Sequence, residues 1–290
     1  MNHLREAVHV VTAHRQHEGG GFVVRRPFPG GILDFVDPFL LLDEMGPADY
    51  APGEALGAPD HPHRGFETVT YLLAGEMEQE DSEGQRGALG PGDVQWMTAG
   101  SGVVHSEMPS KKILRDGGRL HGFQLWVNLP KRDKIMDPRN QEVPASRIPK
   151  AVSSDGKARV AVLAGEALGV RAVIETRTPI LYHDWTLEPG ADVTASLPDG
   201  FDAFAYVFGG EALVGGHKTV DGEMARLGPG DGLRLACASG APGPARLLLV
   251  GGAPLREPVA RWGPFVMNTE GEIRQALLDF QSGRMGRIGR

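Results

Sequence analysis

Cysteine, long apolar runs and clustered positive charge are all scarce in this chain of 290 residues. Its single cysteine, Cys237, excludes an internal disulfide and removes thiolate from any set of metal ligands. No stretch approaches the roughly 18 apolar residues that a membrane-spanning helix needs, and the N-terminal residues lack the apolar segment of a secretory signal. We therefore expect a cytoplasmic protein with no membrane partner.

Charge gives a second exclusion. The chain carries 30 Lys and Arg against 37 Asp and Glu, a net charge of −7, and the basic residues form no stripe of the kind that follows a phosphate backbone. Direct binding to nucleic acid is not expected.

Glycine and proline are abundant, at 41 and 22 residues, and they separate short runs rich in Val, Leu, Phe and Tyr. This punctuation is typical of an all-β protein, and the length suits two domains. Two stretches recur: Tyr-Leu-Leu-Ala-Gly-Glu at 71–76 with Leu-Gly-Pro-Gly-Asp at 89–93 returns in similar form at 206–211 and 227–231. The repeat indicates a tandem duplication. Because the Gly-Pro-Gly-Asp segments lack the Lys-Ser/Thr of a phosphate loop, we interpret them as turns.

Two short pairs carry the chemistry. His61 and His63 are two residues apart, as are His105 and Glu107, and both pairs lie in segments predicted to be strands. Side chains two residues apart share one face of a strand, so the four groups can converge. Imidazole with one carboxylate suits a divalent transition ion, whereas Ca²⁺ and Mg²⁺ prefer oxygen ligands. The pattern predicts a mononuclear metal site.

The second copy carries no equivalent set. Adding the repeat offset places Ser196, Pro198, Gly243 and Ala245 at the corresponding positions, and none of them can bind a metal in the same way. We therefore expect one metal per chain. Within the first copy, Glu67 is also in phase with His63, so strand parity does not decide whether Glu67 or Glu107 is the fourth ligand.

The order of His-x-His, Glu67, a glycine turn, Gly-Pro-Gly-Asp and a third histidine resembles the cupin superfamily. Segments 61–73, 92–100, 124–129 and 263–269 resemble those of the pirin family more specifically. The resemblance implies two tandem cupin (jelly-roll) β-barrels. Residues 1–135 would form a barrel with the metal site, and residues 136–290 a barrel without metal ligands, followed by a helix at about 270–282 packed on the body.

The same resemblance implies the site and its activity. The metal ligands would be His61, His63, His105 and Glu107, with Glu67 beside them as a supporting carboxylate or general base. Pirin-like proteins are associated with quercetin 2,3-dioxygenase activity, in which O₂ cleaves a flavonol. The expected cofactor is one divalent ion, iron(II), although Mn, Ni, Cu, Co or Zn would fit the same donors. Aromatic substrate would meet flat apolar surface from Phe66, Trp96 and Met97.

Two other functions remain open at this point. Pirins also include non-enzymatic, iron-binding regulators that act through contacts with a protein partner, and here the metal would sense redox state. A metal-dependent sugar or keto-acid isomerase would need a basic residue for its anionic substrate, and only Arg64 lies close in sequence.

The C-terminal segment predicts one helix. Thr269 followed by Glu272 matches a capping box, and Gly283 is placed to end the helix. An apolar face is formed by Ile273, Ala276, Leu277 and Phe280. The basic tail at 284–290 is expected to be disordered.

Overall fold

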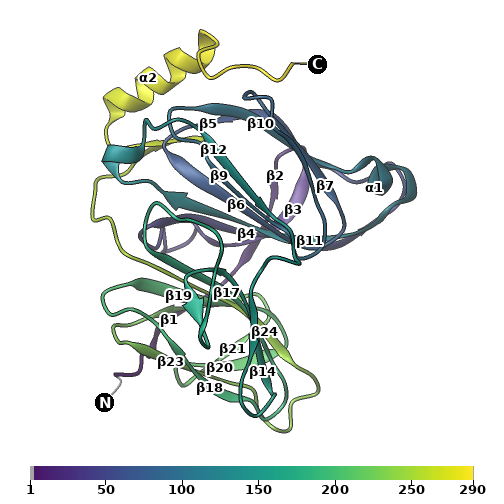
Figure 1. Cartoon of the computed structure of the whole chain (residues 1–290), viewed down its shortest axis with the longest axis vertical. Helices are drawn as coiled ribbons and strands as arrows, with labels where there is room; N and C mark the ends of the chain where they lie inside the picture. The colour runs from purple at the N-terminus through teal and green to yellow at the C-terminus, as the bar shows by residue number, and fades with distance from the viewer. Residues whose placement is uncertain (1–2, 290) are drawn as a thin grey trace. The chain divides into compact units, whose positions relative to one another are not determined.

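The computed structural model describes residues 3–289, which form two compact units (Figure 1). The first-barrel unit contains Arg15–Pro29, Phe39–Ala145 and the residues from Leu255 onward. The second-barrel unit contains the residues up to His14 together with Gly30–Pro38 and Ser146–Pro254. The chain passes between the barrels near the expected position, but each unit also includes the opposite end of the chain. A single division at residue 135 does not describe this exchange.

The first barrel consists of two antiparallel sheets. The order in the seven-stranded sheet is β12 (Arg139–Val143), β9 (Val94–Thr98), β6 (Phe66–Ala74), β11 (Gly118–Asn128), β4 (Phe39–Tyr50), β3 (Phe22–Phe28) and β2 (His14–Glu18). The four-stranded sheet has the order β5 (Ala58–His63), β10 (Val103–Pro109), β7 (Met77–Asp81) and β8 (Arg86–Leu89). The same unit contains α1 (Lys111–Asp116), the 3₁₀ helix η1 (Lys131–Asp133), the pair β25 (Ala260–Trp262) and β26 (Phe265–Met267), and α2 (Glu270–Gln281).

The second barrel repeats this plan. Its seven-stranded sheet has the order β1 (Ala7–Thr12), β22 (Glu223–Leu227), β19 (Asp202–Gly209), β24 (Ala245–Gly252), β17 (Ile180–Leu187), β14 (Ala158–Ala164) and β13 (Lys150–Val152). The four-stranded sheet has the order β18 (Asp192–Ser196), β23 (Gly232–Ala236), β20 (Glu211–Val214) and β21 (His217–Val220), and β15 (Glu166–Ala167) pairs with β16 (Val170–Arg171). The expected all-β bicupin architecture is confirmed.

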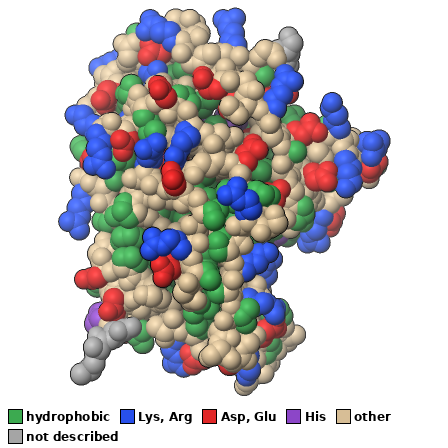
Figure 2. All heavy atoms as spheres, in the orientation of Figure 1, with side chains coloured by type: hydrophobic (Ala, Val, Ile, Leu, Met, Phe, Trp, Pro, Cys, Tyr) green, Lys and Arg blue, Asp and Glu red, His purple; other side chains and the backbone are tan. Residues whose placement is uncertain are grey.

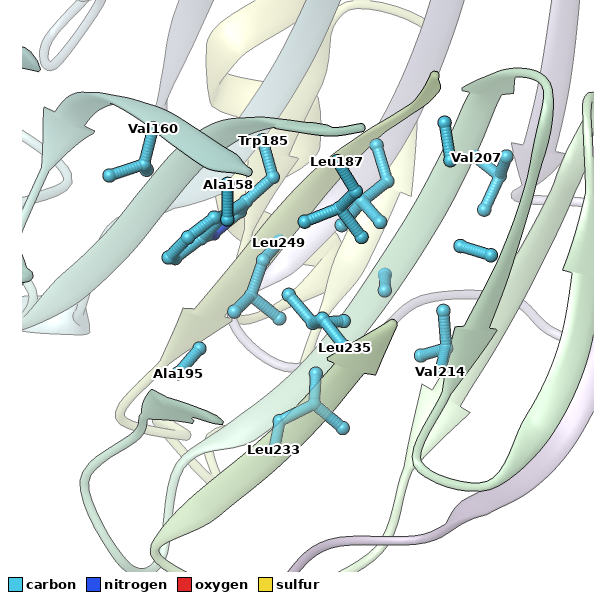
Figure 3. Close-up of a cluster of buried hydrophobic side chains, with 14 of the residues drawn as sticks. Ala158, Val160, Trp185, Leu187, Ala195, Val207, Val214, Leu233, Leu235 and Leu249 are labelled. Atoms are coloured by element: carbon cyan, nitrogen blue, oxygen red, sulfur yellow. The ribbon is translucent and has the colours of Figure 1, made fainter. Parts of the chain in front are cut away.

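Alternate residues of these strands fill the second barrel with apolar side chains. Figure 3 shows Trp185 and Leu187 of β17 facing Leu233 and Leu235 of β23, with Leu249 of β24 between them. All five are almost completely buried. Burial of each such leucine contributes about 1.5–3 kcal/mol, so the interior of this barrel is a packing core.

Strand order identifies the strands of the second barrel that correspond to the two histidine strands. In the first barrel His61 of β5 lies opposite His105 of β10. In the second barrel β18 and β23 take these places, and Ala195 lies opposite Leu233. The repeat offset placed the counterpart of His105 wrongly, at Gly243 beyond β23, because the Gly-Pro-Gly-Asp turn precedes β9 in the first barrel but β23 in the second. The conclusion is unchanged, since the counterparts are apolar.

Helix α2 begins as the sequence predicts. Thr269 and Glu272 form the capping box, while Ile273 and Ala276 are buried against Val104 of the first barrel. The prediction of a disordered tail was wrong. Met285 is buried in the same apolar cluster, and the Ser82 hydroxyl donates a hydrogen bond of 2.8 Å to its carbonyl oxygen.

The surface agrees with the spread of charge along the sequence. On the face shown in Figure 2, acidic and basic side chains are interspersed. Within residues 3–289, none of the helices has the length and apolar character needed to cross a membrane.

Candidate metal centre

Three histidines converge at one end of the first barrel. One potential ligand atom from each of His61, His63 and His105 lies within 4.8 Å of the other two. The ring centroids are 4.3 Å apart for His61 and His105, 4.7 Å for His61 and His63, and 4.9 Å for His63 and His105. Among residues 3–289 this is the one group of three or more His, Cys, Asp or Glu side chains arranged in this way.

Local structure explains the convergence. His61 and His63 share a face of β5, and the antiparallel register brings His105 of β10 opposite His61. Strand β5 ends at His63, and the chain turns at Gly65, whose φ is +86°. A Cβ at Gly65 would lie 2.0 Å from the carbonyl oxygen of Val266, so only glycine fits this close approach.

The imidazoles are prepared as neutral donors. The carbonyl oxygen of Pro59 can only accept, so His61 must donate from Nδ1 across 2.7 Å, which leaves its Nε2 for a metal. Burial, followed by the charges of His105 and His61, holds the pKa of His63 well below its usual value. Burial also lowers the pKa of His105 to about 4, although the charge of Glu107 opposes the shift.

The buried nitrogens support the same interpretation. Within residues 3–289, neither ring nitrogen of His63 or His105 has a hydrogen-bond partner of acceptable geometry. Buried polar atoms without partners are costly, and binding to a metal satisfies them. Three converging imidazoles fit a divalent transition ion.

Glu107 lies beside the histidines but is not within the same 4.8 Å group. Its Oε1 accepts hydrogen bonds from Thr70 Oγ1 at 2.9 Å and from Gln124 Nε2 at 3.0 Å, and more weakly from Gln79 at 3.4 Å. Gln124 Nε2 also lies 3.1 Å from Oε2. The carboxylate is therefore held in a fixed position at the edge of the histidine cluster.

Glu67 is directed elsewhere. It accepts a hydrogen bond of 2.7 Å from Thr98 Oγ1, its direct cross-strand neighbour on β9. Alternation along β6 places Glu67 on the opposite face from Thr70, which contacts Glu107. Parity could not be carried from His63 to Glu67 because the chain breaks its extended conformation at Gly65. We do not include Glu67 in the proposed site.

The histidines open onto a cavity of about 490 Å³, within the usual range for small-molecule sites. His61, His63 and Glu107 line it. Gln124, Trp126, Arg26 and Arg261 also line it and were not predicted from the sequence, whereas Phe66, Trp96 and Met97, which were expected to face the substrate, do not line it. The two-residue spacing of Gln124 and Trp126 on β11 was the available signal.

Aromatic rings extend from the metal ligands into the cavity wall. The ring of His63 lies 5.0 Å from Phe66 and 5.2 Å from Trp126, and these two are 4.4 Å apart. Flat apolar surface in the cavity therefore comes from Trp126, while Phe66 is completely buried behind it and does not line the cavity.

Two arginines face the cavity in different electrostatic states. Arg26 makes two hydrogen bonds to Asp43, at 2.7 and 2.6 Å, and an ion pair of 2.8 Å with Glu18. Burial acts to lower the pKa of Arg26, but these carboxylates outweigh it and raise the pKa. For Arg261, burial and then the charge of Arg26 lower the pKa.

Arg64, the basic residue nearest the motif in sequence, is committed to structure. Its Nη1 donates to Asp279 of α2 at 2.8 Å, and its Nε donates to the Ser101 carbonyl at 2.6 Å. It does not line the cavity. The basis for an isomerase using Arg64 as its anion-binding group is therefore removed.

Comparisons with known proteins agree along nearly the whole chain. The family model described as Pirin matches residues 21–127, and the one described as Pirin C-terminal cupin domain matches residues 182–286. A pirin-like protein of Solanum lycopersicum is 45% identical, covering 97% of this chain and 93% of the relative. Human pirin is 44% identical, covering 95% and 92%. A solved quercetin 2,3-dioxygenase from Acinetobacter baumannii is 34% identical with a TM-score of 0.92, covering 99% of this chain and all of that one.

Proposed function

Because this chain belongs to the pirin family, we propose that it is a metal-dependent dioxygenase that cleaves a flavonol such as quercetin with O₂. The observation that carries the proposal is the convergence of three histidines, two of which line a cavity of suitable size. The similarity to a protein described as a quercetin 2,3-dioxygenase supports it. In this reaction both oxygen atoms of O₂ enter the cleaved product, and one ring carbon leaves as carbon monoxide.

We assign the ligands as His61, His63, His105 and Glu107, with iron(II) as the ion. When bound, the metal supplies a Lewis acid for the flavonol 3-hydroxyl and redox capacity for O₂. Gln124 and Thr70 hold the carboxylate of Glu107, which can receive the 3-hydroxyl proton at Oε2. Trp126 offers the substrate an apolar wall.

The assignment of Glu107 is tested by metal retention. Glu107→Gln replaces the carboxylate by an amide, a weaker donor, and should reduce metal content after dialysis. Glu67→Gln, on the opposite face of β6, should keep the metal. If Glu67→Gln loses the metal and Glu107→Gln keeps it, the fourth ligand is Glu67.

The activity is tested by incubating iron-loaded protein with quercetin under air. The flavonol absorption should fade and carbon monoxide should collect in the headspace, both at rates that His105→Ala abolishes. Loss of quercetin at the same rate in this variant, or without oxygen, would contradict the dioxygenase. That result would favour a redox-sensing regulator instead. Such a regulator should bind a protein partner in only one oxidation state of its iron, which recovery of the partner with each iron form would test.

A further inference from the structure

Arg261 of β25 is the second arginine that lines the cavity. Its guanidinium carbon lies 4.9 Å above the ring of Trp126, a cation–π contact. Its other contact is a long hydrogen bond of 3.4 Å to the carbonyl oxygen of Leu40. In the part of the chain that the structure describes, no carboxylate forms an ion pair with it.

The contrast with Arg26 is informative. Asp43 and Glu18 already neutralise Arg26, so the acidic residues of that wall are occupied. Thr70 and Gln124 hold Glu107 beside the histidines. Arg261 is therefore the cation in this cavity that remains available to a ligand.

Arg261 also lies within electrostatic reach of the metal site. Its charge is among those that disfavour protonation of His63. Trp126 links the two, since its ring lies 5.2 Å from the His63 ring and 4.9 Å from the Arg261 guanidinium. A planar molecule lying along Trp126 can thus approach the histidines at one end and Arg261 at the other.

We propose that Arg261 determines substrate specificity by binding an anionic oxygen at the end of a planar aromatic substrate remote from the histidines. The substrate class is then an aromatic with two separated oxygen functions: one that reaches the metal site and one ionised group, such as a phenolate, that pairs with the guanidinium. This assignment rests on the proposed function for its reaction, but binding tests it alone. Because Trp126 already orients Arg261, little side-chain freedom is lost when the anion binds.

The test compares two flavonols that share the 3-hydroxyl and 4-carbonyl. Quercetin carries further hydroxyl groups at its periphery, and 3-hydroxyflavone carries none. Dissociation constants are measured on zinc-loaded protein, which does not turn over, at several pH values between 6 and 9. Arg261→Gln should weaken quercetin binding about 10- to 100-fold and remove its strengthening as pH rises, while 3-hydroxyflavone changes less than about threefold.

Matched variants separate charge from packing. Arg261→Lys should retain part of the affinity for quercetin that Arg261→Gln loses. Arg132→Gln, at an exposed arginine on η1, should leave the dissociation constants of both flavonols unchanged. Equal losses for both flavonols, or no loss of quercetin affinity, would overturn the role of Arg261. If Arg261 distinguishes quercetin from 3-hydroxyflavone but no carbon monoxide is released, only the proposed dioxygenase activity is contradicted. If carbon monoxide is released but Arg261→Gln binds quercetin as tightly as wild type, only the proposed role of Arg261 is contradicted.

Discussion

Neutral imidazole is the form of histidine that binds a metal, and burial supplies it in this protein. His63 and His105 are each only 2% exposed, and the absence of solvent disfavours their charged forms. In the metal-free protein the same effect lowers the stability of the folded state at acid pH, because unfolding exposes both imidazoles to water and allows them to be protonated.

This gives a pH dependence with a definite sign. Between pH 6.5 and about 4, His105 is neutral in the folded metal-free protein and protonated in the unfolded chain. The unfolded state therefore binds more protons, and the free energy of unfolding should fall as the pH falls. The contribution is on the order of 3 kcal/mol. Urea unfolding of metal-free protein should show a shallower pH dependence in His105→Asn than in wild type; identical slopes would contradict it.

A substitution at Gln124 should change the metal affinity of the site without replacing any of the proposed ligands. Its amide contacts both oxygens of Glu107. Gln124→Leu keeps a similar volume but releases the carboxylate, and metal affinity should fall about 10- to 100-fold. Competition with a chelator measures the change, with Gln141→Leu on β12 as the control. An unchanged affinity would mean that Glu107 is not a ligand, or that Gln124 does not position it.

At the scale of elements, α2 is tied to the metal-binding strands by one buried ion pair. Arg64 follows His63 directly, and its guanidinium reaches Asp279 on α2 as well as the carbonyl of Ser101, in the turn before β10. The C-terminal helix thus supports both segments that carry histidines. Its own start is fixed by the Thr269 capping box.

Removing one partner of this pair should be costly, because the other charge remains buried. Arg64 and Asp279 are 7% and 8% exposed. Asp279→Ala should destabilise the protein by about 3 kcal/mol, whereas Asp116→Ala, which removes an exposed pair with Arg115, should have much less effect. Urea unfolding followed by circular dichroism compares the variants, and similar losses for the two would exclude a supporting role for the ion pair.

At the scale of the whole molecule, the two barrels share one fold but differ in the side chains that their strands direct inward. Where β5 and β10 of the first barrel carry His61 and His105, the corresponding strands of the second barrel, β18 and β23, bury apolar side chains such as Ala195 and Leu233. A metal cannot be held there, since hydrocarbon side chains offer no donor atoms.

The division of roles can be measured directly. Elemental analysis should find one metal per chain in wild type and none in a His61→Ala, His63→Ala variant, while His217→Ala, at an exposed histidine on β21, keeps it. Leu233→Ala should cost about 2–5 kcal/mol through the cavity it leaves, with metal content unchanged. Two metals per chain, or metal retained in the double variant, would contradict the single site.

The sequence by itself determined the features that depend on short-range chemistry. Turn residues and short apolar runs indicated an all-β protein, the two-residue spacing of His61 and His63 predicted metal ligands, and Thr269 with Glu272 indicated the start of α2. The internal repeat and the resemblance to pirins implied two cupin barrels. The turns, the His61 and His63 pair and the capping box each depend on neighbours within a few residues, so local patterns were sufficient for them. The sequence also indicated that the second barrel lacks ligands, although the offset pointed to the wrong positions.

Only the tertiary structure decided which distant residues meet. Strand pairing placed the apolar Ala195 and Leu233 on the strands of the second barrel that correspond to the histidine strands. The turn at Gly65 sent Glu67 to the other face of its sheet. Gln124, Trp126 and Arg261 reach the cavity from β11 and β25, far from the histidine motif in sequence. Non-local pairing sets these contacts, and a one-residue change of register reverses which face a side chain occupies. Sequence spacing alone does not determine the register of strands that are distant in the chain.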